Sequence, residues 1–141
     1  MICDERQKLL AKNLVNFSIR CQKGDKVWID AFGIDSAFVN TLVDAVYDAG
    51  GVPFVFLHDR RVERCVYRRA SDEQFEFMAG HDAKLMSEMQ CYIGVRGGGN
   101  SFELSDLPSD RMQAFSSLYS HPVHHEQRVA KTKWVILRYP T

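Results

Sequence analysis

Four short apolar segments spaced along the chain constrain its fold more than any other feature. They are rich in Val, Ile, Phe and Trp and occupy residues 26–32, 53–58, 91–96 and 133–140. Helical patterns separate them, and buried parallel strands connected by helices show this alternation. Right-handed crossovers with one reversal between the second and third strands give the order 2-1-3-4. The sequence therefore predicts an α/β fold, a three-layer sandwich in which a mostly parallel four-stranded sheet carries helices on both faces.

Helical patterns fill the intervals between these segments. The first helix is expected to bury one stripe, formed by Leu10, Leu14, Phe17 and Cys21, and to end at Gly24. Further helices are predicted from a cap at Ser36 to Gly50, over 60–70, from Ser71 to a break at Gly80, over 85–89 and from Ser109 onward. The second segment, 53–58, is apolar on both faces and is expected to be buried on both.

Length and charge restrict the classes of protein to which the chain can belong. Its 141 residues suit one hydrophobic core, so residues 1–141 are expected to form a single α/β domain. Eighteen basic residues balance eighteen acidic ones, which gives no electrostatic case for binding nucleic acid or an anionic membrane. No apolar run is long enough to span a membrane. We therefore expect partners that are neither nucleic acid nor membrane.

The cysteine pattern indicates a reducing environment. The chain has four cysteines, at Cys3, Cys21, Cys65 and Cys91, and no two of them form a CxxC pair. Free thiols in this pattern are typical of the cytoplasm, which is the predicted location. None has an adjacent histidine, so we expect Cys65 and Cys91 to pack in the core as small hydrophobic residues.

The loops after the strands are the first places to look for a ligand, because ligands of parallel sheets meet the carboxyl ends of the strands. Arg96 ends the third segment, and the run Gly97-Gly98-Gly99-Asn100 follows it. This run has neither the lysine of a Walker loop nor the spacing of a dinucleotide fingerprint, so it predicts a turn. The run His58-Asp59-Arg60-Arg61 after the second segment either binds an anion or begins a solvated helix, and the second is commoner.

A histidine cluster is the one arrangement that resembles a metal site. His121 and His125 stand four residues apart and can share a helix face, as zinc ligands do, and His124 lies beside them. However, Pro122 stands where the zincin motif has a glutamate, and no further ligand is near in sequence. We therefore predict a solvated helix end and no metal in this chain.

Several segments in a fixed order resemble one family. They are "LVNFSIRCQKGDKVWIDA" at 14–31, "SDEQFEFM" at 71–78, the spacing from Arg96 to Asn100 followed by "ELSD" at 103–106, and "TKWVILRYPT" at 132–141. In this order and spacing they resemble the N-terminal domain of the thermophilic metallo-aminopeptidases, the family of aminopeptidases T and S. The resemblance runs from about Leu9 to Thr141, with "RYPT" the most telling piece.

The resemblance implies a function that this chain performs only as part of a longer one. Members of the family are cytoplasmic, dimeric, two-metal enzymes that remove N-terminal residues from peptides, and their metal ligands lie in a C-terminal domain. The resemblance thus implies that a catalytic domain with two zinc or cobalt ions follows Thr141. It also implies that the full enzyme can form a homodimer. No catalytic residue and no metal ligand carries over to this chain, which should be inactive alone.

The expected role of this piece is to wall the active site and to form interfaces. Arg96, Asn100 and Arg138 are the candidates for the substrate side or for contacts between domains, because they sit at or after the carboxyl ends of strands. Two alternatives stay open. One is a stand-alone α/β module that binds a small ligand at the strand ends, and the other is an assembly domain with no ligand.

Overall fold

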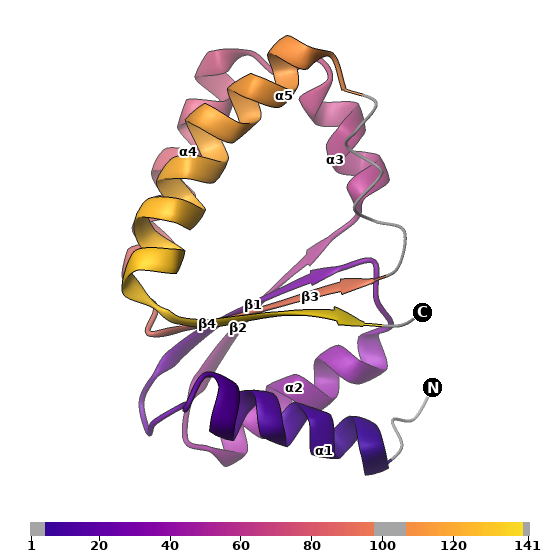
Figure 1. Cartoon of the computed structure of the whole chain (residues 1–141), viewed down its shortest axis with the longest axis vertical. Helices are drawn as coiled ribbons and strands as arrows, with labels where there is room; N and C mark the ends of the chain where they lie inside the picture. The colour runs from indigo at the N-terminus through magenta and orange to yellow at the C-terminus, as the bar shows by residue number, and fades with distance from the viewer. Residues whose placement is uncertain (1–4, 98–106, 140–141) are drawn as a thin grey trace.

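The four predicted strands form one parallel sheet. A computed structural model describes residues 5–97 and 107–139. The strands are β1 (Lys26–Phe32), β2 (Val52–His58), β3 (Cys91–Gly97) and β4 (Lys133–Tyr139). Their order is β2-β1-β3-β4, and each neighbouring pair is parallel (Figure 1). The predicted order and direction of the strands are therefore confirmed.

Helices cover both faces of the sheet, which confirms the three layers. The lower layer in Figure 1 holds α1 (Glu5–Asn13), the π-helical turn η1 (Leu14–Ser18) and α2 (Ser36–Asp48). The upper layer holds α3 (Arg60–Tyr67), α4 (Asp72–Ser87), α5 (Ser109–Phe115) and its π-helical continuation η3 (Ser116–Val129). Within the described ranges, no helix is both long enough and apolar enough to cross a bilayer.

The lower core follows from the alternation of side chains along each strand. Val27 and Ile29 of β1 and Ile93 and Val95 of β3 are fully buried and pack in one cluster with residues of α1 and α2. The intervening residues of the same strands point to the upper face. The two faces of the sheet therefore carry separate sets of side chains, and the upper set contains polar groups.

The upper layer has two apolar clusters. One lies against the sheet and includes Trp28, Met86, Tyr92 and Val123. The other lies farther along the helices and includes Tyr67, Phe75 and Leu107, with Phe115 packed against it. Because the second cluster joins the helices to one another, the upper helices do not need apolar contacts with the whole length of the sheet.

Three helix boundaries differ from the prediction. The first helical segment ends with η1 at Ser18 and not at Gly24. Gly80 does not interrupt a helix, because α4 continues through it from Asp72 to Ser87. A glycine inside a helix costs only about 1 kcal/mol, and the burial of Phe75 and Met86 on either side outweighs it. The helix α2 is capped by Asp35, whose Oδ1 accepts from the backbone N–H of Ala37 at 2.7 Å, one residue before the predicted cap.

Three predictions of burial were wrong. Phe17 is 75% exposed, because the wider turn η1 shifts the helical phase and buries Val15 instead. Cys65 is exposed on α3, whereas Cys91 is buried as expected. Strand β2 lies at the edge of the sheet, and Leu57 on this strand is 71% exposed.

Candidate functional site

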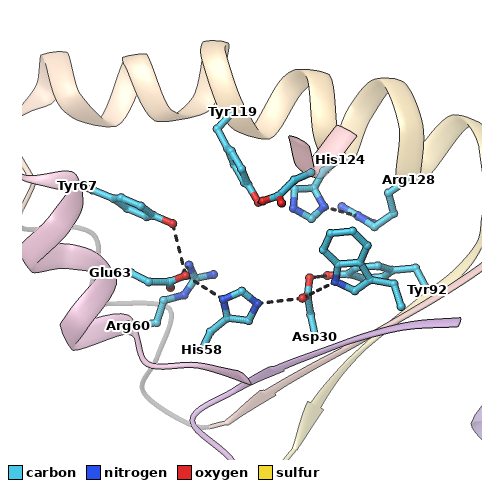
Figure 2. Close-up of polar contacts among 11 residues, drawn as sticks. Asp30, His58, Arg60, Glu63, Tyr67, Tyr92, Tyr119, His124 and Arg128 are labelled. Atoms are coloured by element: carbon cyan, nitrogen blue, oxygen red, sulfur yellow. Dashed lines mark hydrogen bonds and ion pairs between the residues drawn. The ribbon is translucent and has the colours of Figure 1, made fainter. Parts of the chain in front are cut away.

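The upper face of the sheet carries one buried carboxylate. Asp30, which is 2% exposed, follows Trp28 by two residues on β1 and therefore points to the same face. Its Oδ1 accepts from Trp28 Nε1 at 2.6 Å, and its Oδ2 accepts from the hydroxyl of Tyr92 at 2.6 Å. His58 Nε2 lies 2.9 Å from the same Oδ1 (Figure 2). The carboxylate thus has three hydrogen-bond partners from three neighbouring strands.

His58 joins this carboxylate to a second one. Its Nδ1 lies 3.0 Å from Glu63 Oε2 on α3, and Glu63 Oε1 accepts from Arg60 Nη1 at 2.9 Å (Figure 2). Burial alone would lower the pKa of His58, but its hydrogen bonds to Asp30 and Glu63 outweigh burial and raise the pKa to about 9. The imidazole is therefore a cation at neutral pH, and both of its N–H groups donate to carboxylates.

The same hydrogen bonds keep Asp30 ionised. Burial opposes its charge, but the bonds from His58, Tyr92 and Trp28 and the positive charge of His58 lower the pKa of Asp30 below its ordinary value. Phe32 stacks on His58 with the ring centroids 4.4 Å apart. The guanidinium carbon of Arg60 lies 4.2 Å from the centroid of the same Phe32 ring. These contacts form a row of alternating negative and positive side chains, Asp30, His58, Glu63 and Arg60. With Tyr92 and Arg128 beside it, this row is the polar network of the upper face.

A glycine makes the contact between Tyr92 and Asp30 geometrically feasible. Gly94 is the residue on β3 that pairs with Asp30, and Tyr92 precedes it by two positions on the same face. A Cβ atom at Gly94 would lie 3.0 Å from a ring carbon of Tyr92 and 3.2 Å from its hydroxyl. The absence of a side chain at Gly94 therefore lets the phenol lie along the strand toward Asp30.

Helix η3 supplies the opposite wall. Arg128 is 8% exposed, and its Nε donates to Nδ1 of His124 at 2.9 Å (Figure 2). Its guanidinium carbon lies 5.0 Å from the ring centroid of Tyr92 and 4.9 Å from that of Trp134. Burial and the nearby charge of Arg128 lower the pKa of His124 to about 4. His124 is therefore neutral, accepts at Nδ1 and carries its proton on Nε2.

A cavity of about 110 Å³ lies between these two walls. Its lining comes from β1, β3, α3, α5 and η3, and includes Phe32, Glu63, Arg96, Tyr119 and Arg128. Three buried side-chain atoms have no hydrogen-bond partner among the described residues: Arg96 Nε, Arg128 Nη1 and Gln127 Oε1. Two of them belong to arginines that line this cavity.

The predicted strand-end residues are only partly brought together. Arg96 pairs in register with Phe32 on one side and with Arg138 on the other. Arg96 lines the cavity, whereas Arg138 is exposed on β4 and is not among the lining residues. Asn100 lies outside the described residues, as do Gly98 and Gly99 of the same glycine run. In the run His58 to Arg61, Asp59 does cap a helix, but His58 and Arg60 turn inward to the network.

The three clustered histidines do not converge on one point. His124 faces the cavity and Arg128, whereas His121 and His125 are exposed and stack on each other with centroids 5.5 Å apart. His121 Nε2 lies 3.3 Å from Glu126. The absence of a metal here stays a prediction, and the divergence of the rings supports it.

In the part of the chain that the structure describes, one group of three potential metal ligands occurs. It consists of Cys21, Asp25 and Cys91, whose ligand atoms lie within 4.8 Å of one another. The ammonium of Lys133 already sits 3.0 Å from Asp25 Oδ2. Burial raises the pKa of both thiols, that of Cys91 to about 12. Protonated thiols and a neighbouring ammonium are a poor setting for a cation.

Most residues of this polar network were not predicted as site residues from the sequence. Asp30 stands alone inside the apolar run "KVWIDAF", and an acid at such a place is costly unless it is paired. That anomaly was the one available signal. Glu63, Tyr92 and Arg128 carry no comparable signal, because their spacing in the sequence is ordinary and only the crossovers bring them near Asp30.

These features define a parallel α/β domain with a polar cavity between the carboxyl half of its sheet and the helices above it. The family model of the thermophilic metalloproteases (M29) matches residues 3–141. The chain therefore belongs to that family.

A solved structure shows the same fold. It is wild-type AmpT from Thermus thermophilus, with a TM-score of 0.71 and 19% sequence identity, and the match covers 94% of this chain. The chain spans only 35% of the length of that structure. Among curated protein sequences, no significant match is found.

Proposed function

We propose that this chain is the non-catalytic N-terminal domain of a two-metal aminopeptidase that removes N-terminal residues from peptides. The observation that carries the proposal is the family match over residues 3–141, together with a structural match that extends over only 35% of the longer chain. A catalytic domain beyond Thr141 would then hold two zinc or cobalt ions. A cytoplasmic location and a homodimer belong to the same proposal.

The donor set in the described residues does not fit a hydrolytic metal pair. Such a site needs several carboxylates or imidazoles that converge on two ions about 3.5–4 Å apart. Asp30 and Glu63 are each engaged by the His58 cation, and Glu63 also by Arg60. In the group formed by Cys21, Asp25 and Cys91, the carboxylate of Asp25 is paired with the ammonium of Lys133. This supports placing the metals outside the described part of the chain.

The carboxyl edge of the sheet is the surface best suited to face a second domain. Phe32, His58, Arg96 and Arg138 form one register row across the four strands. A wall whose side chains are already held in place lowers the entropic cost of positioning a substrate against it. We assign to this edge the role of an inner wall, with Arg138 as the exposed residue available to a partner domain.

An activity assay tests the proposal. The 141-residue chain and a chain extended along the same reading frame are compared for metal-dependent release of leucine from a leucyl-arylamide. We expect turnover only from the extended chain. In that chain, Arg138→Ala should change KM or kcat while the bound metal stays at its wild-type level. Saturable, metal-dependent turnover by the short chain after repurification would overturn the proposal.

A stand-alone ligand-binding module is the second candidate, and the cavity of about 110 Å³ is the observation that favours it. The reading frame distinguishes the two. A stop codon directly after Thr141 supports the module, whereas a continuation that encodes clustered glutamates and histidines supports the peptidase.

A further inference from the structure

The cavity beside Arg96 and Arg128 is rich in hydrogen-bond donors that have no acceptor. Arg128 uses its Nε for His124, but its Nη1 lacks a partner among the described residues. The Nε of Arg96 is also buried and lacks a hydrogen-bond partner among the described residues. Buried donors without acceptors are costly, and native proteins seldom leave two of them around one cavity. A group that accepts hydrogen bonds inside the cavity would remove this cost.

The carboxylates nearby do not serve as that acceptor, because none makes a hydrogen bond with Arg96 Nε or Arg128 Nη1, and each bonds to other groups. Asp30 has three partners, and Glu63 has His58, Arg60 and the hydroxyl of Tyr67 at 3.4 Å. The hydroxyl of Tyr119 donates to Asp82 Oδ2 on α4 at 2.6 Å. Asp30, Glu63 and Asp82 therefore leave Arg96 Nε and Arg128 Nη1 without an acceptor, and a group bound in the cavity could supply one.

The charges around the cavity favour an anion. The positive groups are Arg60, Arg96, Arg128 and the protonated His58, and the negative groups are Asp30, Glu63 and Asp82. His58 and Arg60 are paired with carboxylates, whereas no ion pair within the described residues engages Arg96 or Arg128. The two unpaired cations lie on facing walls, one on β3 and one on η3, so their fields add inside the cavity.

The size of the cavity restricts the ligand to a compact group. A volume of about 110 Å³ corresponds to the space of roughly four water molecules at ~30 Å³ each. Phe32, Tyr92 and Phe115 contribute aromatic walls. His124 adds a donor, because its Nδ1 accepts from Arg128 and its proton is therefore on Nε2.

We propose that this cavity binds a compact oxyanion, either a carboxylate or inorganic phosphate, between the guanidinium groups of Arg96 and Arg128. Guanidinium groups match the oxygens of both ligands with two parallel hydrogen bonds, and His124 Nε2 supplies a further donor. His58 and Asp30 are positioning residues, because they hold Tyr92 in the place where its ring packs against Arg128. The site stands independently of any peptidase activity.

Nuclear magnetic resonance tests the site directly in the 141-residue chain. The Nε–Hε signals of the arginines are followed at constant ionic strength while chloride is replaced stepwise by acetate, by phosphate or by citrate. We expect saturable shifts of the Arg96 and Arg128 signals with acetate or phosphate, and none with citrate, which is too large. Saturation by acetate alone assigns the site to carboxylates, and saturation by phosphate alone assigns it to phosphate.

Three variants identify the cavity as the place of binding. Arg96→Gln should weaken the affinity at least about tenfold, which is the value of one lost charged hydrogen bond. Arg138→Gln is the matched control, since it removes the exposed arginine paired with Arg96 in the sheet and should bind as wild type. Ser120→Leu fills the cavity without altering any charge and should abolish binding, and its thermal melting profile shows whether it is folded.

Three results would overturn the proposal. They are shifts that stay linear and identical for chloride, acetate and phosphate, an equal loss of affinity in Arg96→Gln and Arg138→Gln, and wild-type binding by a folded Ser120→Leu. None of these results bears on the activity of the extended chain, so the two proposals fail separately.

Discussion

His58 Nε2 and Asp30 Oδ1 lie 2.9 Å apart, although the two residues are 28 positions apart in the chain. The contact joins the edge strand β2 to the central strand β1 on the upper face of the sheet. Because both groups are charged and largely buried, the pair contributes to stability and also fixes the aromatic residues around it. The first two predictions test this pair.

Removing the charge of Asp30 should be strongly destabilising. In Asp30→Asn the buried cation of His58 loses one of its two carboxylate partners, and breaking such a pair costs about 3 kcal/mol. The free energy of unfolding from urea titration measures the change. Asp44→Asn, which alters an exposed carboxylate on α2, should stay within about 0.5 kcal/mol of wild type. Equal effects of the two substitutions would contradict the assignment.

Stability should fall as the pH rises from neutral into the alkaline range. The pKa of His58 is raised from 6.5 to about 9, so the folded state binds this proton more tightly than the unfolded state does. The stabilisation is complete below pH 6.5 and is lost as the pH approaches 9, and it amounts to about 3 kcal/mol. The difference in unfolding free energy between wild type and His58→Gln should shrink over that window. A difference in unfolding free energy that stays constant from pH 6 to pH 9 would refute the raised pKa of His58 in the folded state.

Two glycine substitutions should act in opposite directions. Gly94→Ala places a Cβ 3.0 Å from the ring of buried Tyr92 and should cost about 1–3 kcal/mol by displacing it from Asp30. Gly80→Ala meets nothing within 4 Å, lies inside α4 and should stabilise by up to about 1 kcal/mol. Thermal unfolding of both variants checks the pair, and a neutral Gly94→Ala would show that Tyr92 is not held as described.

The fold was predictable because it depends on patterns that are local in the sequence. Each strand is a short apolar run, and the S-x-x-Q pattern does cap α4, with Ser71 Oγ accepting from the backbone N–H of Gln74 at 3.1 Å. The phase of η1 and the continuation of α4 through Gly80 depend on packing against other elements. Periodicity along one segment contains no information about that packing.

The candidate site was less accessible for a related reason. Arg96 was identified because the end of a strand is a general place for ligands, and it does line the cavity. Arg128 comes from a helix that begins after the third strand, and its neighbours Tyr92 and Trp134 lie on two different strands. Only the parallel register brings these residues together, so no single stretch of sequence indicates the site.

The thiols should differ sharply in reactivity. Cys65 is exposed, whereas Cys91 is buried and its pKa is raised to about 12, which leaves almost no thiolate at neutral pH. In a Cys3→Ser background, a chromogenic disulfide reagent should modify one thiol quickly, and Cys65→Ser should remove that phase. A fast phase that survives in the double variant would show that Cys21 or Cys91 is accessible.

Metal binding by the two lengths of chain tests the central claim most directly. Equilibrium dialysis against zinc or cobalt, followed by elemental analysis, counts the bound ions. We predict no stoichiometric metal on the 141-residue chain and two ions on the chain extended past Thr141, with Cys21→Ser unchanged from wild type in both. One or two tightly bound ions on the short chain would contradict the assignment of this domain as non-catalytic.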